Sequence, residues 1–438
     1  MLQKTFNREN RELTLAGLRK RNFPNAEAVI DEVISIDTSI RYSQDQRDQA
    51  RANLKQLSNR FHTSTRAGDI AGLQGIKSEI EAQQLRLKFY EVELDRLEPN
   101  LNNLLYTIPN LPHSSVPAGR SADDNEVVLE HGEIPVLHEG AKPHWELIQG
   151  FGPNGTALID FELGNKIAGA GFPVYRGKGA RIQRAMINFF LDRALEAGYM
   201  EVQPPIVINE ASGFGTGQLP DKEGQMYYAT EDKLYLIPTA EVPITNLYRD
   251  VIVADGDLPI KNTGYTPCFR REAGSWGAHV RGLNRLHQFD KVELVRIEKP
   301  ENSYAALEEM SLHVQKLLQE LELPYRVLRL CGGDMGFTSA LTYDMEVWSA
   351  AQGRWLEVSS VSNFETYQAN RLKLRYRVER SAVAGKTQLL HTLNGSALAL
   401  PRILASILEN NQFLTEEGKI AIRVPKVLVS YCGFEVFD

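Results

Sequence analysis

The residues best suited to chemistry lie in one stretch, 269–293, where charged and aromatic side chains flank a glycine-rich loop. The two flanks predict the strands of a hairpin. An arginine on one strand, Arg270, could bind a phosphate or carboxylate through two hydrogen bonds. An aromatic ring on the other strand, Phe289, offers a face on which a base can stack. Either residue alone could belong to an ordinary charged hairpin, but the whole string favours a binding site.

This hairpin would lie in a region of mixed strands and helices that begins near residue 120. Short β-rich runs at 235–248 and 291–297 alternate with amphipathic helices predicted over 179–197, 303–321 and 402–413. Such an order predicts an α+β fold with an antiparallel sheet rather than a doubly wound one. The sequence contains neither GxGxxG nor GxxxxGK[S/T], so we expect neither a dinucleotide-binding fold nor a P-loop.

The first hundred residues follow a different pattern, in which apolar side chains recur at alternating steps of four and three. The pattern runs from Val29 to Phe61, breaks at 62–72, and resumes from Leu73 to Leu104. A 3.5-residue repeat on both sides of a short break predicts an antiparallel coiled-coil hairpin, with an arm on the order of 50 Å long. Pro99 lies inside the second half, and we expect it to kink or interrupt that helix.

One section of this arm is basic. Residues 41–66 carry six Lys or Arg against two Asp, a local balance of +4 in a chain whose net charge is −7. A solvated helix face and a phosphate-binding stripe both explain such a run, and the sequence leaves both interpretations open. The second helix is net acidic over 69–98, so any basic face would be one-sided.

Proline, serine and glycine gather at 108–119, a composition typical of a linker. We therefore predict two domains, a helical one over 1–110 and a larger one over 111–438. Hydrophobic residues make up 42% and charged residues 24% of the 438, which is the balance of a soluble globular protein.

The composition also bears on metal binding and location. Cys268, Cys331 and Cys432 are too few and too scattered for a disulfide framework or a zinc cluster. No apolar run approaches the roughly 20 residues that cross a bilayer. The N-terminus resembles neither a signal peptide nor a transit peptide. These features predict a cytoplasmic protein with no membrane association.

The stretch at 269–293 closely resembles motif 2 of class II aminoacyl-tRNA synthetases, in its bacterial seryl-tRNA synthetase form. Residues 198–207 (GYMEVQPPIV) resemble motif 1, and 391–412 resemble motif 3. Residues 237–241 (IPTAE) are similar to the family's serine-side loop, and 355–371 to the strand that holds the metal and ATP. The predicted arm is similar to the family's tRNA-binding domain, so the resemblance spans nearly the whole chain.

The resemblance implies a class II antiparallel β-sheet catalytic domain with helices, preceded by a long antiparallel coiled-coil arm. It implies a serine–tRNA ligase that activates serine with ATP to seryl-adenylate and transfers it to the 3′ end of tRNA(Ser), and of tRNA(Sec) where present. It also implies ATP as substrate, Mg²⁺ as cofactor, and tRNA(Ser) bound by the arm. The implied assembly is a homodimer with Pro205 at its interface.

Residue roles follow from the same resemblance. Arg270, Glu357 and Arg402 match the catalytic positions, with Arg270 on the α-phosphate and the serine carboxylate. Phe289 would stack on adenine, and Glu357 and Ser360 would hold the metal, since Mg²⁺ prefers oxygen ligands. The positions matched to ATP are Arg270, Arg271, Glu272, Arg285, Leu286, Phe289, Glu357, Val358, Ser359, Ser360 and Arg402. Glu272 is expected near the adenine, and Arg285 and Arg402 on the β- and γ-phosphates.

The positions matched to serine combine carboxylates with small polar groups, which suit an ammonium group and a hydroxyl. They are Thr239, Ala240, Glu241, Arg270, Glu293, Asn394 and Ser396. Simpler roles remain open for some residues: Glu357 could be a salt-bridge partner, and Asn394 and Ser396 could cap the helix that follows. His287 suggests a general base, but a positioning role is preferred because a carboxylate nucleophile needs no base.

The sequence departs from the common family pattern at a few positions. Ala278 and His279 stand where many members have a basic residue and Asp, in a loop that can approach the tRNA acceptor end. Ala397 and Pro401 stand where many motif 3 sequences have glycine. All positions matched to ATP and metal keep suitable chemistry.

Three other functions were weighed. A non-catalytic synthetase paralogue is disfavoured because Arg270, Glu357 and Arg402 are all present. A synthetase-like ligase that loads a carrier protein would be expected to lack the long arm. A purely structural coiled-coil protein would not carry more than 300 further residues with coherent site chemistry.

Overall fold

The computed structural model describes residues 1–221, 223–272, 281–378 and 385–438. The chain forms two compact units, Met1–Pro109 and Asn110–Asp438. Gly274, Gly277, Ala278 and His279, which belong to the glycine-rich loop, lie outside the described residues.

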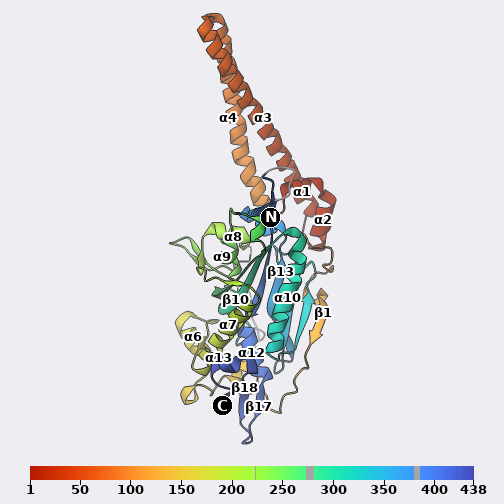
Figure 1. The fold of residues 1–438 in the computed structure, drawn as a ribbon, viewed down its shortest axis with the longest axis vertical. Helices are drawn as coiled ribbons and strands as arrows, with labels where there is room; N and C mark the ends of the chain where they lie inside the picture. The colour runs from red at the N-terminus through yellow and green to blue at the C-terminus, as the bar shows by residue number, and fades with distance from the viewer. Residues whose placement is uncertain (222, 273–280, 379–384) are drawn as a thin grey trace. The chain divides into compact units, whose positions relative to one another are not determined.

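The first unit is helical. Two short helices, α1 (Lys4–Glu9) and α2 (Arg11–Lys20), precede two long ones, α3 (Ala26–Ala67) and α4 (Ile70–Tyr106). Helices α3 and α4 pack along each other as an antiparallel hairpin (Figure 1). Ion pairs join Arg51 to Glu91 and Arg60 to Glu79, so later residues of α3 meet earlier residues of α4. The predicted coiled-coil arm is confirmed.

The apolar repeat accounts for this packing. Residues at the predicted seam positions are buried on both helices, among them Val33, Ile40, Leu57, Ile76 and Leu94. Since an isolated helix gains little from its own backbone, burial of this seam supplies most of the stability of the arm.

Two details of the arm differ from the predictions. The break expected at 62–72 is wrong, because α3 continues to Ala67 and α4 begins at Ile70. Gly68 makes the turn in the left-handed conformation (φ 71°), and the Asp69 side chain accepts a hydrogen bond from the backbone N–H of Gly72. Two residues thus suffice for the reversal.

The expected interruption at Pro99 is also wrong, because α4 continues through it to Tyr106. Proline removes one backbone hydrogen bond from a helix interior. Beyond it, Leu101 and Leu105 are only 3% and 2% exposed. Burial of these two side chains offsets the lost hydrogen bond and holds the last turns in the helix.

An eight-stranded sheet dominates the second unit. Its strand order is β1-β11-β12-β13-β16-β10-β9-β4, and every neighbouring pair is antiparallel except β4 with β9. The predicted antiparallel α+β fold is confirmed. The strands are β1 (Glu126–His131), β4 (Met200–Glu201), β9 (Ile260–Phe269), β10 (Gln288–Glu298), β11 (Tyr325–Arg329), β12 (Leu341–Ser349), β13 (Arg354–Asn363) and β16 (His391–Ala399).

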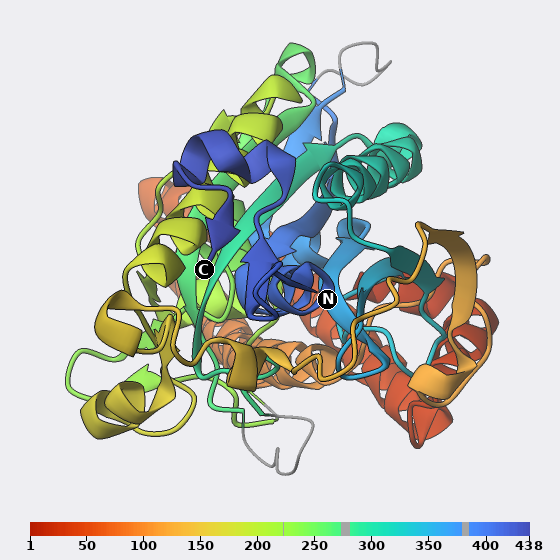
Figure 2. The same ribbon diagram turned by 90° about the horizontal axis from the view of Figure 1, so that it is seen from below.

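Three amphipathic helices pack against this sheet, as Figure 2 shows for α7 and α10. They are α7 (Lys178–Glu196), α10 (Ser303–Glu320) and α12 (Leu400–Asn410), close to the three predicted ranges. Helix α12 ends earlier than expected because Gln412–Leu414 forms a strand, β17. The run at 235–248 is mostly not β: after β7 (Leu234–Leu236) it forms helix α9 (Glu241–Asn246).

Shorter elements complete the unit. The helices are α5 (His144–Leu147), α6 (Phe161–Ala168), α8 (Glu210–Thr216), α11 (Thr366–Leu372) and α13 (Lys426–Cys432). The strands are β2 (Ile159–Asp160), β3 (Val174–Tyr175), β5 (Val207–Ile208), β6 (Tyr228–Ala229), β8 (Ile252–Val253), β14 (Arg375–Arg377), β15 (Thr387–Leu389), β18 (Ile420–Arg423) and β19 (Val436–Phe437). Among the described residues, no helix combines the length and apolarity of a membrane span.

Two glycines of the arm should respond oppositely to the same substitution. Gly68→Ala places a side chain at φ 71° and should destabilise the turn by about 1 kcal/mol. Gly75→Ala lies within α4 with open space around the new methyl group, and should stabilise the helix by up to about 1 kcal/mol. Hydrogen exchange of the hairpin tip should therefore rise in the first variant and fall in the second. Changes of the same sign would contradict this explanation of the turn.

Candidate active site

The hairpin of β9 and β10 arranges a row of side chains along one strand. Successive side chains of a strand point to opposite faces, so Phe289, Lys291 and Glu293 of β10 share one face. Arg270 follows the end of β9, and its guanidinium lies 5.3 Å from the centre of the Phe289 ring. Its Nε donates to the Pro238 carbonyl at 3.4 Å. A cation is thus held beside a partly buried aromatic ring.

His287 helps to place this arginine. Its carbonyl accepts a hydrogen bond from the Arg270 backbone N–H (2.9 Å), and its own N–H donates to the Gly171 carbonyl (2.9 Å). Its ring nitrogen Nδ1 lies 2.7 Å from the Tyr227 hydroxyl. These contacts support the positioning role that the sequence favoured over a general base.

Two further arginines approach the same region. Arg285 forms an ion pair with Glu272. Arg402, on α12, donates to the Asn284 carbonyl (3.0 Å) and to the Glu357 carbonyl (2.7 Å), and lies 3.6 Å from the Glu357 carboxylate. The three predicted phosphate-binding arginines are therefore tied to the β9–β10 hairpin and to β13. Such a set of cations suits a polyanion.

A cluster of buried acidic side chains lies near Arg270. The Asn394 side chain donates to Glu241 (2.9 Å) and to Glu293 (2.7 Å), which brings the two carboxylates together. Glu293 is 0% exposed and forms an ion pair with Lys291 (2.6 Å), which also donates to the Thr239 hydroxyl (2.8 Å). One buried lysine thus faces two buried carboxylates, which leaves a negative charge to be compensated.

The charge state of this cluster depends on pH. Burial, together with the nearby charge of Glu293, raises the pKa of Glu241 to about 7. Gln368 donates to Glu241 at 2.7 Å and partly opposes this shift. A ligand with an ammonium group would supply the missing positive charge and favour the ionised form of Glu241.

A β-bulge arranges a second group of oxygen ligands. In the β12–β13 ladder, Glu346 faces Glu357 and Asp344 faces Ser360, so β13 contains one extra residue between these pairs. Asp344 and Glu346 are two apart and share a face, so Glu357 and Ser360 share it too. Three residues apart on a regular strand, they would lie on opposite faces.

Asp344 belongs to the same group. Burial, the adjacent Glu357 charge and other acids raise the pKa of Asp344 well above its usual value. Its Oδ1 is buried without a hydrogen-bond partner. No cluster of three or more His, Cys, Asp or Glu side chains in a metal-binding arrangement occurs within the described ranges. Glu357 and Ser360 offer hard oxygen donors of the kind that Mg²⁺ shares with substrate phosphates.

Comparison with known proteins identifies the family. Residues 1–112 match the seryl-tRNA synthetase N-terminal domain, and residues 227–411 match the class II tRNA synthetase core domain (G, H, P, S and T). The serine–tRNA ligase of Salinibacter ruber is 48% identical over 406 residues, which cover 93% of this chain and 92% of that protein. The chain belongs to the seryl-tRNA synthetase family.

Solved structures of seryl-tRNA synthetases share the fold. The enzyme of Pyrococcus horikoshii, complexed with ATP, has a TM-score of 0.90 at 32% identity and covers 100% of this chain and 99% of its own. The cytoplasmic enzyme of Naegleria fowleri, in complex with AMP, has a TM-score of 0.85 at 26% identity, with the same coverage. The long arm and the antiparallel sheet are thus properties of the family.

The remaining predicted residues fall into three groups. Leu286, Val358 and Ala240 have buried side chains, and the buried Ser359 hydroxyl donates to the Ser396 carbonyl, so only their backbones can face a ligand. Arg271 and Pro205 are exposed. Ser396 donates to Glu293 at 3.4 Å, as a residue of the acidic cluster should.

Sequence reasoning missed Lys291, Gln368 and Asp344. Lys291 could have been found from the sequence, because it lies two residues from both Phe289 and Glu293 on a predicted strand and must share their face. Gln368 and Asp344 carried none, since each meets its partners through contacts between separate elements.

Lys291 should be essential to the stability of the second unit. Lys291→Met leaves Glu293 buried without its cation, and should destabilise the fold by about 3–5 kcal/mol. Thermal unfolding of the variant and the wild type measures the effect. Lys419→Met is the control, since Lys419 and its partner Glu417 are 76% and 73% exposed and should contribute little. Equal effects of the two variants would contradict the assignment.

Proposed function

We propose that this chain activates serine with ATP and transfers it to the 3′ end of tRNA(Ser), and of tRNA(Sec) in cells that contain it. The observation that carries the proposal is the buried pair Glu241 and Glu293, joined through Asn394 near Arg270. Its carboxylates suit the ammonium group and hydroxyl of serine, and the arginine suits the serine carboxylate and a phosphate. Relatives solved with ATP and with AMP support ATP as the second substrate.

In the first step, the serine carboxylate attacks the α-phosphorus of ATP, and pyrophosphate leaves. The carboxylate is already a nucleophile, so the protein contributes alignment and charge stabilisation. Arg270 holds the carboxylate and the α-phosphate together, while the Phe289 face receives the adenine. Arg285 and Arg402 bind the β- and γ-phosphates. Glu272, which forms an ion pair with Arg285, lies near the adenine.

Glu357 and Ser360 would hold Mg²⁺, with Asp344 opposite Ser360 on the neighbouring strand β12. When bound, the ion neutralises charge on the phosphate oxygens. The residues fit this role because the β13 bulge sets two hard oxygen donors on one face of the strand, and two protein ligands would leave the other positions of the ion to phosphate and water. Arg402 contacts Glu357, so it would lie between the metal ion and the phosphates.

In the second step, the terminal adenosine hydroxyl of tRNA attacks the carbonyl of the adenylate. The arm of α3 and α4 would bind the tRNA through its basic section. Arg41 and Lys55 are exposed there, whereas Arg51 and Arg60 contact carboxylates of α4. A homodimer formed through the segment after β4 completes the proposal. Pro205 is exposed there beside Met200, Ile206 and Val207, which are 59%, 40% and 40% exposed.

Pyrophosphate exchange tests the activity directly. Purified protein with Mg²⁺, ATP and labelled pyrophosphate, but no tRNA, should form labelled ATP with serine and not with alanine or threonine. Alanine leaves the cluster's polar groups unpaired, and threonine is too large. Arg270→Ala should reduce kcat/KM by about a hundredfold or more, because it removes charge stabilisation at the α-phosphate. A folded wild-type protein that shows no exchange with serine would sink the proposal.

The arm can be tested separately. The double variant Arg41→Ala, Lys55→Ala should raise the KM for tRNA several-fold in aminoacylation and leave serine-dependent exchange unchanged. Added salt should reduce the difference, because the lost contacts are to phosphates. Glu81→Ala, which removes an exposed acid from α4, serves as the control and should not weaken tRNA binding. An unchanged KM in the double variant would exclude these two residues from the tRNA interface.

A further inference from the structure

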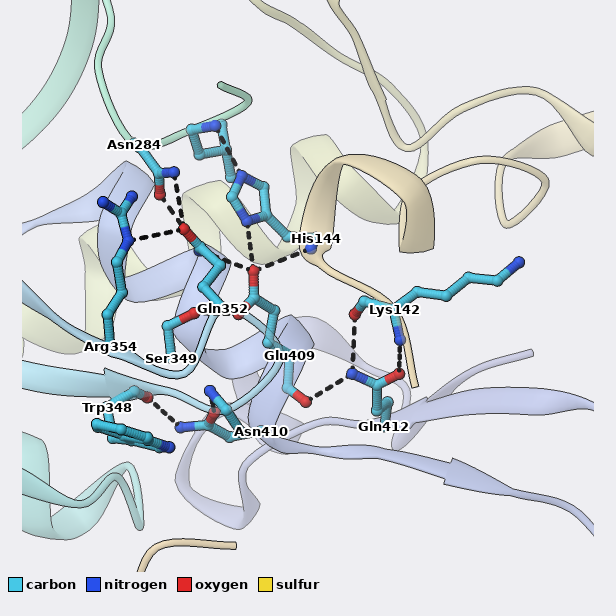
Figure 3. A network of polar contacts seen from close by, with 12 residues as sticks. Lys142, His144, Asn284, Trp348, Ser349, Gln352, Arg354, Glu409, Asn410 and Gln412 are labelled. Atoms are coloured by element: carbon cyan, nitrogen blue, oxygen red, sulfur yellow. Dashed lines mark hydrogen bonds and ion pairs between the residues drawn. The ribbon is translucent and has the colours of Figure 1, made fainter. Parts of the chain in front are cut away.

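A buried polar network lies outside the substrate contacts just proposed, on the side of α12 that faces α5 (Figure 3). His144 and Glu409, from α5 and α12, are both fully buried. The His144 ring nitrogen Nδ1 lies 2.7 Å from the Glu409 carboxylate, and the His144 backbone N–H donates to the same oxygen at 3.0 Å. Neither residue belongs to the substrate contacts proposed above.

The other ring nitrogen has a defined partner. The backbone N–H of Leu283 donates to His144 Nε2 at 2.8 Å. Nε2 must therefore be unprotonated, so the proton of the neutral ring is on Nδ1 and is donated to Glu409. Hydrogen bonds from His144 and Ser349 lower the pKa of Glu409 below its usual value, although burial acts to raise it. The pair is a neutral imidazole oriented by a carboxylate.

The chain approaches this ring closely at Gly282. A Cβ placed on Gly282 would lie 2.2 Å from His144 Nε2, and the residue has a φ of +67°. Only glycine fits there without moving the ring. The approach brings the Leu283 N–H within hydrogen-bond reach, and so fixes the chain where it returns from the glycine-rich loop. We call residues 282–285 the return limb.

The network continues to the proposed phosphate ligands. Gln352 donates to Glu409 (3.0 Å) and accepts from the Asn284 side chain (3.0 Å), as Figure 3 shows. The Asn284 carbonyl accepts from Arg402 Nε (3.0 Å). Arg285, the last residue of the return limb, pairs with Glu272. Both arginines proposed for the β- and γ-phosphates are thus attached to a segment that His144 and Gln352 hold.

We propose that the His144–Glu409 pair positions the return limb so that Arg285 and Arg402 meet the β- and γ-phosphates of ATP. The inference rests on the proposed function and deepens its ATP half. His144 and Glu409 are positioning residues that act through the limb. A buried carboxylate is a poor choice for stability alone, because apolar side chains of similar volume stabilise a core at least as well. The neighbouring residues of α12 are such side chains, among them Leu404, Ile407 and Leu408.

Two substitutions at one position separate positioning from simple packing. In His144→Asn, the amide can donate to Glu409 in place of Nδ1 but does not reach Leu283. In His144→Gln, the longer amide can accept the Leu283 N–H in place of Nε2. In pyrophosphate exchange, the asparagine variant should raise the KM for ATP about tenfold, the effect of one lost buried hydrogen bond. The KM for serine should not change, and the glutamine variant should recover most of the ATP affinity.

A second histidine of the same unit serves as the control. His313→Gln alters a partly buried histidine of α10 whose ring lies 6.2 Å from Tyr199, and it should leave both KM values unchanged. Circular dichroism and the unfolding temperature establish that each variant is folded. If the asparagine variant does not fold, Gln352→Met removes the bridge between Glu409 and Asn284 at a less buried site. It should show the same selective rise in the KM for ATP.

Three results would overturn the inference: an unchanged KM for ATP in folded His144→Asn or Gln352→Met, an equal rise in the KM for ATP and for serine in either variant, or no recovery of ATP affinity in His144→Gln. The proposed function is judged separately, by wild-type exchange with serine. Should the wild type show no exchange, equilibrium dialysis of ATP against wild type and the asparagine variant still tests the positioning role. Weaker ATP binding by the variant supports it, and equal binding refutes it.

Discussion

Two buried carboxylates, Glu241 and Glu293, lie close enough for Asn394 to donate to both, and only Glu293 has a lysine, Lys291, as its ion-pair partner. Burying uncompensated charge is far more expensive than burying apolar surface. The surrounding residues therefore stabilise this charge. Lys291 forms an ion pair with Glu293, and Asn394 and Gln368 donate hydrogen bonds to Glu241. The charge that remains is what a ligand with an ammonium group would compensate, so in the proposed function the same charge that costs stability attracts serine.

Register is what brings these groups together. Pairing of β10 with β16 sets Glu293 opposite Ser396, and alternation along β10 sets Phe289 and Lys291 on the face of Glu293. The bulge in β13 does the same for Glu357 and Ser360. The arginines are not on this rigid ladder. Arg270 comes just after the end of β9, Arg285 lies in the return limb, and Arg402 lies near the start of α12. These positions need additional support, which His287 and the His144–Glu409 pair would provide.

The local pattern of apolar residues in the sequence predicts much of the fold. The heptad seam predicted the arm because the same 3.5-residue spacing governs which side chains of α3 and α4 are buried. The interruption predicted at Pro99 is wrong because the prediction considers only the backbone hydrogen bond that proline removes. Burial of Leu101 and Leu105 stabilises the helix beyond it. The motif resemblance named most residues of the site. It did not name His144 and Glu409, which lie 265 positions apart and meet only through tertiary packing.

The most direct test of this account is the protonation state of Glu241 with and without serine. Its pKa of about 7 means that just below this pH much of the free protein carries a protonated Glu241, and the serine ammonium group should drive the proton off. Infrared difference spectra on adding serine should then show loss of a carboxylic-acid C=O band and gain of carboxylate bands. Both should be absent in Glu241→Gln. A spectrum of the wild type without the carboxylic-acid loss, recorded with serine bound, would contradict the claim that ligand charge completes this cluster.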